Sequence, residues 1–150
     1  MGTCWKDGTP EPRCLSEDTL IDTPDGPTSV RELTVGSLVF TVDTTGRKIV
    51  APLLAASHFE VPRSHEMSHV VLDDGREMLI SPGHPTCSAA RSSRSMATLA
   101  DLAKGERYDG GNVMKAERVP YGRDATFDIL PGGETGCYWA NGVLLGSTLR

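Results

Sequence analysis

The eight residues Ser29-Val-Arg-Glu-Leu-Thr-Val-Gly36 recur in pattern as Thr98-Leu-Ala-Asp-Leu-Ala-Lys-Gly105, at an offset of 69 residues. Both stretches read hydroxyl, apolar, any residue, acid, Leu, any, any, Gly. This pattern is typical of a short helical turn that Ser29 or Thr98 caps, with the acid at its third position and glycine ending it. The offset exceeds the roughly 20 to 50 residues of a solenoid repeat. The pattern therefore predicts a duplicated β subdomain with pseudo-twofold symmetry, with chance similarity of two capped turns as the alternative.

Short apolar runs between turn signals surround both copies, as is typical of strands. Two hairpins stand out, one around Asp73-Asp-Gly75 and one around Asn141-Gly142, the preferred residue pair of a type I′ turn. Sixteen glycines and ten prolines among 150 residues indicate a turn-rich chain below the level of low complexity. We therefore expect one all-β domain that begins at Cys14, after an extended lead segment 1–13.

The charge balance and the apolar stretches exclude several classes of function. Twenty acidic and fifteen basic residues give a net charge of -5, so no long-range positive field attracts nucleic acid or an anionic membrane. The longest apolar stretch, residues 51–56, is far shorter than the roughly 20 residues that span a bilayer. We expect a monomer with no nucleic-acid or membrane partner.

Four reactive side chains stand in informative places outside the repeat. Cys14 lies at the junction of the lead segment and the domain. Ser81 and His84 stand three residues apart in a loop stiffened by prolines, which can hold two groups on one small target. Asp128 is a lone carboxylate in the apolar strand 126–130, and a buried acid needs either a partner or a function.

In this order the motifs resemble the Hint modules, the self-processing domains of inteins, bacterial intein-like domains and Hedgehog proteins. The resemblance runs from Cys14 to Ser147. It rests on Cys-Leu-x-x-x-Thr-Leu-Ile at 14–21, Ser-Pro-Gly-His-Pro at 81–85, Phe-Asp-Ile-Leu at 127–130 and Tyr-Trp-Ala-Asn-Gly-Val-Leu-Leu at 138–145. It implies an all-β, horseshoe-like disc of two related halves, with 1–13 as a flanking segment and 14–150 as the self-processing domain.

The resemblance also implies an autocatalytic reaction at the bond between Arg13 and Cys14. Cys14 matches the nucleophile, whose sulfur attacks the Arg13 carbonyl and turns the amide into a thioester, an N-to-S acyl shift. Ser81 and His84 match the Thr-x-x-His positions of the family, whose His contacts the scissile nitrogen. Asp128 matches a catalytic acid that either accepts the thiol proton or activates a later nucleophile. Water or a small thiol then releases the N-terminal flank, with no cofactor or metal.

The last strand departs from the pattern of relatives that carry out protein splicing. Those relatives end it with His-Asn, because cyclisation of the Asn cuts the C-terminal junction. Gly146-Ser147 occupies that place here, and neither residue can cyclise. We therefore expect no splicing and no ordinary C-terminal cleavage, and we expect Asn141-Gly142 to act as a turn despite its proneness to succinimide formation.

The remaining cysteines leave alternatives open, because no C-x-x-C spacing indicates a zinc knuckle or redox pair. Cys87 and Cys137 are expected as core residues. A zinc site of Cys14, His84 and Cys137 is the alternative, and it would block the nucleophile. Cys4 is a candidate redox partner, since an oxidised link to Cys14 would also silence it.

His58, His65 and His69 cluster in the sequence, and we expect a solvated loop there in preference to a metal site. The alternative to self-cleavage is a Hint-like scaffold that no longer processes itself and serves as a binding or structural module. A zinc-binding β module is a third possibility that rests on the scattered Cys and His residues alone.

Overall fold

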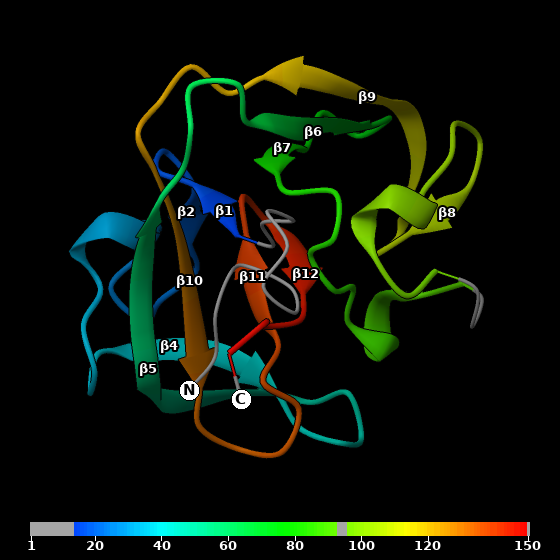
Figure 1. Ribbon diagram of the computed structural model, residues 1–150. Helices are drawn as coiled ribbons and strands as arrows, with labels where there is room; N and C mark the ends of the chain where they lie inside the picture. Colours follow the sequence, from blue (N-terminus) through cyan, green and yellow to red (C-terminus); the bar gives the residue numbers. More distant parts are fainter. Residues whose placement is uncertain (1–13, 93–95, 150) are drawn as a thin grey trace.

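The computed structural model describes residues 14–92 and 96–149; the flanking segment 1–13, including Cys4 and Arg13, lies outside them. The described part is built of short and long β-strands and three 3₁₀ turns (Figure 1). The strands are β1 Leu15–Ser16, β2 Leu20–Ile21, β3 Thr28–Ser29, β4 Leu38–Val42, β5 Lys48–Glu60, β6 Glu66–Leu72, β7 Glu77–Ile80, β8 Arg107–Tyr108, β9 Gly111–Pro120, β10 Ala125–Pro131, β11 Tyr138–Ala140 and β12 Val143–Leu145. The turns are η1 Val30–Glu32, η2 Ser88–Ala90 and η3 Leu99–Asp101.

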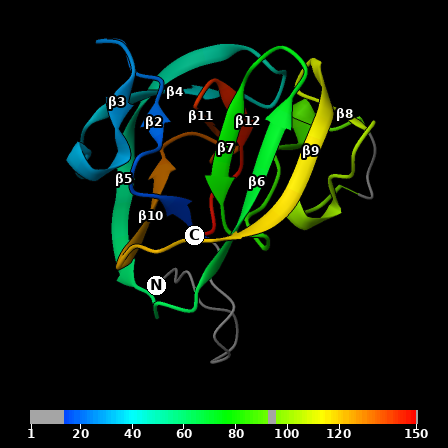
Figure 2. The same ribbon diagram turned by 90° about the horizontal axis from the view of Figure 1, so that it is seen from above.

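Strand β1 is only two residues long, yet it joins the two halves of the large sheet. That sheet has the order β4-β5-β10-β1-β7-β6-β9-β8, and a smaller one has the order β12-β11-β2-β3. Leu15 pairs with β10 on one side and with β7 on the other. Figures 1 and 2 show β5 and β10 as one arm, β6, β7 and β9 as the other, and the β11–β12 hairpin between them. Cys14 therefore enters the fold at the joint of the two arms.

The two copies of the repeat form the same device in the two halves. Each copy starts with a three-residue 3₁₀ turn, η1 or η3, and ends at a glycine with positive φ. The φ angle is 94° at Gly36 and 92° at Gly105. The Gly36 N–H donates to the Leu53 carbonyl at 2.9 Å, and the Gly105 N–H donates to the Val113 carbonyl at 2.7 Å. A hairpin follows each copy, β4–β5 or β8–β9. The fold is all-β, and its architecture agrees with the duplicated module expected from the sequence.

The β11–β12 hairpin carries apolar side chains of both strands into the core between the arms. Val143, Leu144 and Leu145 are buried there. The connecting turn has φ of 50° at Asn141 and 79° at Gly142, as a type I′ turn requires. The Asn141 side chain also accepts from the Leu20 N–H at 2.9 Å. Asn141 therefore has the structural role that the sequence predicts.

Cys87 and Cys137 are buried as predicted, but they form a disulfide that the sequence analysis missed. The bond joins the start of η2 to the residue before β11, with 6.0 Å between the two Cα atoms and 50 residues between the cysteines in sequence. No short spacing announces such a pair, because the fold alone brings the segments together. With both sulfurs bonded to each other, Cys137 is not available to a zinc site with Cys14 and His84.

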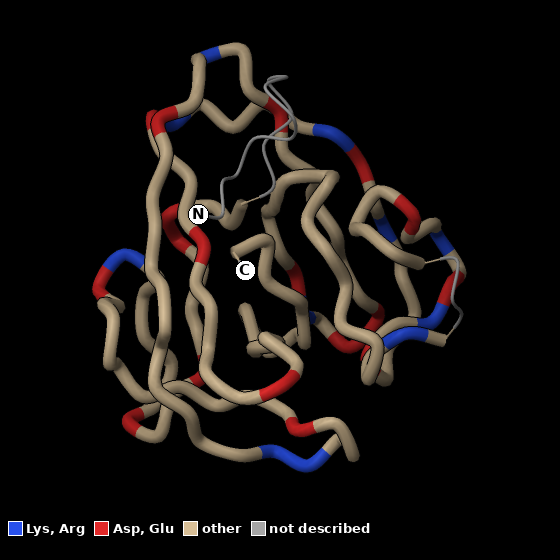
Figure 3. The backbone as a smooth tube through the Cα atoms, turned by 60° about the horizontal axis from the view of Figure 1, so that its bottom comes forward, with Lys and Arg blue, Asp and Glu red and all other residues tan. Residues whose placement is uncertain are grey.

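Within 14–92 and 96–149, the charged residues are scattered over both halves (Figure 3). The 3₁₀ turns, three residues each, are the longest helices of the described residues, so none of these helices can traverse a bilayer.

Candidate functional site

The register of β1 places Cys14 between two of the other candidate residues. Because Leu15 is opposite β10 and β7, the residue before it continues the pairing toward Asp128 on one side and Ser81 on the other. The Ser81 N–H donates to the Cys14 carbonyl at 2.9 Å. Cys14, Ser81 and Asp128 are all fully buried. Three segments that lie far apart in the sequence thus meet at the first residue of the domain.

The loop that carries His84 is fixed at both of its ends. The His84 N–H donates to the Ser81 carbonyl at 3.0 Å, which closes a turn around the prolines of the loop. The His84 carbonyl accepts from the Leu99 N–H at 2.9 Å, so the second copy of the repeat holds the loop from outside. The Ser81 hydroxyl donates to the Met67 sulfur at 3.5 Å. Among the described contacts, Ser81 supports the site through its backbone.

The imidazole of His84 is buried and held by the last strand region. Its Nε2 lies 2.7 Å from the Gly146 carbonyl oxygen and 3.0 Å from the Tyr138 hydroxyl. A carbonyl oxygen can only accept, so we assign the proton of the neutral ring to Nε2. The other ring nitrogen, Nδ1, is then the atom through which the ring takes up or gives away a proton.

Asp128 is the most heavily hydrogen-bonded side chain of the site. Its Oδ1 accepts from the Tyr138 hydroxyl at 2.6 Å and from the Ile129 N–H at 2.8 Å. Its Oδ2 accepts from the Thr148 N–H at 2.9 Å and from the Thr148 hydroxyl. Two donors on each oxygen use the acceptor capacity of an ionised carboxylate. The lone acid of the apolar strand is therefore a paired, hydrogen-bonded one.

Tyr138 and Thr148 belong to the site although the sequence analysis did not single them out. Burial, the charge of Asp128 and the hydrogen bond to it together raise the pKa of Tyr138 well above its usual 10. The phenol therefore stays protonated and remains a donor to Asp128. Tyr138 stands in a motif that carries the resemblance, but its hydroxyl partners follow only from the fold. Thr148 lies after the last matched residue, where no sequence signal exists.

The residues in the place of the splicing His-Asn pair have structural contacts. The Gly146 N–H donates to the Pro85 carbonyl at 3.1 Å, and the Ser147 hydroxyl donates to the Ile129 carbonyl at 2.6 Å. A Cβ atom on Gly146 would lie 3.1 Å from the Thr86 carbonyl oxygen. The end of the chain is thus packed against both the His84 loop and β10.

We expect Asp128→Asn to lower the free energy of unfolding by about 2 kcal/mol. Each carboxylate oxygen accepts hydrogen bonds from donors, so the –NH₂ group of the asparagine would face another donor and leave it without an acceptor. The melting temperature should then fall by about 5 °C, which thermal unfolding followed by circular dichroism measures. Asp18→Asn is the matched control, since the Asp18 side chain is 62% exposed and, among the contacts of the described residues, pairs with Arg123 alone. Equal melting temperatures for the two variants would contradict the hydrogen-bonded role of Asp128.

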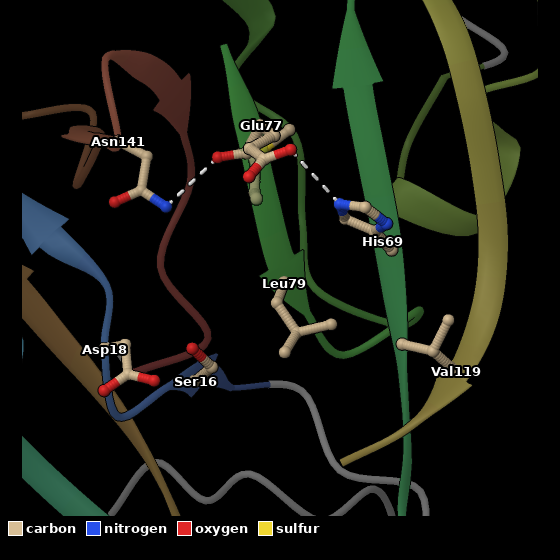
Figure 4. Close-up of a pocket in the computed structure, with 8 residues that line it drawn as sticks. Ser16, Asp18, His69, Glu77, Leu79, Val119 and Asn141 are labelled. Carbon is tan, nitrogen blue, oxygen red and sulfur yellow. Dashed lines mark hydrogen bonds and ion pairs between the residues drawn. The ribbon is translucent and has the colours of Figure 1, made fainter.

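The histidines outside the site do not lie in a solvated loop as predicted. His58 belongs to β5 and His69 to β6, while His65 is buried in the turn between these strands. Burial lowers the pKa of His65 below its usual 6.5. Figure 4 shows His69 beside Glu77. The distance from His69 Nε2 to the Glu77 carboxylate is 3.4 Å, and both residues line a surface pocket of about 330 Å³. No cluster of three or more metal-ligating side chains occurs in 14–92 and 96–149.

The fold is that of inteins and bacterial intein-like domains. Three solved structures illustrate this likeness. A bacterial intein-like domain from Clostridium thermocellum has a TM-score of 0.74 at 15% identity, covering 89% of this chain and 98% of its own. A DnaB intein from Synechocystis sp. PCC 6803 has 0.73 at 14%, covering 89% and 97%. The gp41-1 intein has 0.65 at 19%, again covering 89% and 97%. No family model and no curated protein matches the sequence.

Proposed function

We propose that the chain is a single-turnover self-cleaving domain that releases its own N-terminal flank. The observation that carries the proposal is the meeting of Cys14, His84 and Asp128 at the joint of a fold shared with inteins. Cys14 is disulfide-bonded in the structure, so the reaction begins once a reductant has converted it to the thiol. The sulfur then attacks the carbonyl carbon of Arg13, the bond from that carbon to the Cys14 nitrogen breaks, and the thiol proton ends on the nitrogen. Arg13 lies outside the described residues.

His84 is proposed to move this proton through Nδ1. Because Nε2 donates to the Gly146 carbonyl, a neutral ring can accept the thiol proton at Nδ1 and deliver it to the departing nitrogen. An ordinary thiol with a pKa of about 8.5 is a few per cent ionised at pH 7, so full ionisation lowers the barrier by only about 2 kcal/mol. A half-life of about half an hour needs a barrier of about 22 kcal/mol. Orientation and protonation of the leaving nitrogen must therefore supply most of the catalysis.

Asp128 is proposed to act in the second step, when a nucleophile cleaves the thioester. Its two oxygens already accept four hydrogen bonds, so taking the thiol proton first would require breaking one of them. Water or a small thiol that uses Asp128 as a base must displace one of these donors at that later stage. The acceptor is then a small soluble molecule, and the substrate is the flanking polypeptide.

The test is a reporter fused before Met1, with products weighed by mass spectrometry. Dithiothreitol alone is ambiguous, because it cleaves thioesters and also reduces the Cys87–Cys137 disulfide. Hydroxylamine cleaves a thioester without reducing disulfides, and a phosphine reduces disulfides without supplying a thiol. We expect hydroxylamine together with the phosphine to release a fragment that ends in a hydroxamate at Arg13, and Cys14→Ala to abolish it. A second reporter after Arg150 should stay attached.

The same reagents also distinguish self-cleavage from an inactive scaffold. An intact fusion after days in hydroxylamine plus phosphine would refute self-cleavage and support a scaffold that no longer processes itself. Release that requires the phosphine in the parent chain, but not in Cys4→Ser, would support the proposed oxidised link between Cys4 and Cys14. Cys4 lies outside the described residues. Equal release with and without the phosphine would reject that link.

A further inference from the structure

One buried hydroxyl lies between the two catalytic candidates His84 and Asp128. Tyr138 Oη is 3.0 Å from His84 Nε2 and 2.6 Å from Asp128 Oδ1. We propose that Tyr138 is a positioning residue that couples the imidazole to the carboxylate and thereby stabilises the imidazolium formed during cleavage. This inference rests on the proposed function for its catalytic meaning, but the coupling itself can be tested without cleavage.

The protons in this chain can be assigned from the acceptors. The phenol has one proton, and it donates this proton in a hydrogen bond to the Asp128 carboxylate. Asp128 Oδ1 is the closer partner, and an ionised carboxylate can only accept. The phenol oxygen then turns a lone pair toward Nε2. The Nε2 proton already points at the Gly146 carbonyl at 2.7 Å, so the phenol oxygen is a second acceptor beside it. The hydrogen bonds therefore run in one direction, from imidazole to phenol to carboxylate.

This direction favours a positive charge on the ring. When Nδ1 gains the thiol proton, the ring becomes a cation whose Nε2–H faces the Gly146 carbonyl and a phenol oxygen polarised by Asp128. Hydrogen bonds that involve charged groups are stronger than neutral ones, and chains of them polarise one another in a buried site. The titratable groups that the described contacts link to the imidazole come from two elements: Tyr138 of β11, and through it Asp128 of β10. Cys14 before β1 is disulfide-bonded and does not titrate in this form.

Tyr108 provides a matched control because it is also a fully buried tyrosine. Its hydroxyl accepts from the Cys87 N–H at 3.1 Å and donates to the Leu144 carbonyl. Both partners are backbone groups, so Tyr108→Phe removes a buried hydroxyl without touching His84 or Asp128. A role for Tyr138 that is only structural predicts the same behaviour for the two Tyr→Phe variants.

The first measurement is the titration of the imidazole by NMR in the uncut Cys14→Ala background. The His84 signal is identified as the one missing from His84→Ala. We expect Tyr138→Phe to move its titration midpoint to lower pH by about one unit, because the cation loses its link to the carboxylate. Tyr108→Phe should leave the midpoint in place. Equal midpoints in all three proteins would overturn the proposed coupling.

The second measurement is the rate of hydroxylamine-induced release in the reporter fusion. We expect Tyr138→Phe to slow release about tenfold and Tyr108→Phe to change it less than about twofold. In the Asp128→Asn background the Tyr138→Phe change should add little, since the acceptor of the phenol proton is altered. Equal slowing by both Tyr→Phe variants would refute a positioning role. A parent fusion that does not cleave refutes the proposed function but leaves the NMR result to decide the coupling.

Discussion

His84→Ala is expected to slow release of the N-terminal flank by about 100-fold or more, the usual contribution of a positioned acid–base group. The amide nitrogen of Cys14 leaves poorly unless it is protonated, and we propose that His84 protonates it. The rate is measured with the reporter fusion in hydroxylamine at pH 7. The proton transfer precedes thioester cleavage, so a faster nucleophile should not rescue the variant.

Two further variants separate chemistry from folding. His84→Gln keeps an N–H donor for the Gly146 carbonyl, which Nε2 now reaches at 2.7 Å, but it cannot carry a proton between atoms. It should therefore fold and still cleave as slowly as His84→Ala. His69→Ala removes a partly exposed histidine that pairs only with Glu77 among the described contacts, and it should cleave at the parent rate. A His84→Gln variant as fast as the parent would show that His84 has no role in proton transfer.

Removing the Cys87–Cys137 disulfide is expected to cost the largest share of stability. Closing a loop of 50 residues stabilises a fold by about 4 kcal/mol in the chain-entropy account. The double variant Cys87→Ala/Cys137→Ala should therefore melt about 10 °C lower than the parent, as measured by circular dichroism. Both positions are buried among apolar side chains, so alanine leaves no unpaired polar group behind.

The control for this prediction is chemical reduction. A phosphine should lower the melting temperature of the parent chain to near that of the double variant and should leave the double variant unchanged. Reduction without effect on the parent would mean that the bond contributes nothing to stability. The result also bears on the site, because Cys137 directly precedes Tyr138 and Cys87 follows His84 by three residues.

Sequence reasoning reached the architecture because the repeat expresses a local rule twice. A capped turn that ends at Gly36 or Gly105 needs only a few neighbouring residues to form, and these residues are readable in order. The order of the motifs was enough to propose Cys14, His84 and Asp128 as site residues. Their position in the fold could not be predicted in this way, because it depends on β1 joining two arms whose strands lie far apart in sequence.

The features that escaped sequence reasoning depend on packing between distant segments. Cys87 and Cys137 are buried whether or not they are bonded, so apolar context alone does not reveal the disulfide. Tyr138 reads as one more apolar strand residue until the hairpin places its hydroxyl between two partners. Thr148 lies in no motif, and only the return of the chain end to β10 brings its hydroxyl to Asp128.

The close approach of the backbone at Gly146 limits which residues can be introduced at this position. Its carbonyl orients the ring of His84, and any side chain placed there would press on the Thr86 carbonyl at 3.1 Å, within the loop that carries that ring. We therefore expect that introducing His and Asn at 146 and 147 would displace the loop of His84, the residue that we propose to act at the first junction. Gaining the second cut without losing the first would require redesign of the 84–86 backbone as well.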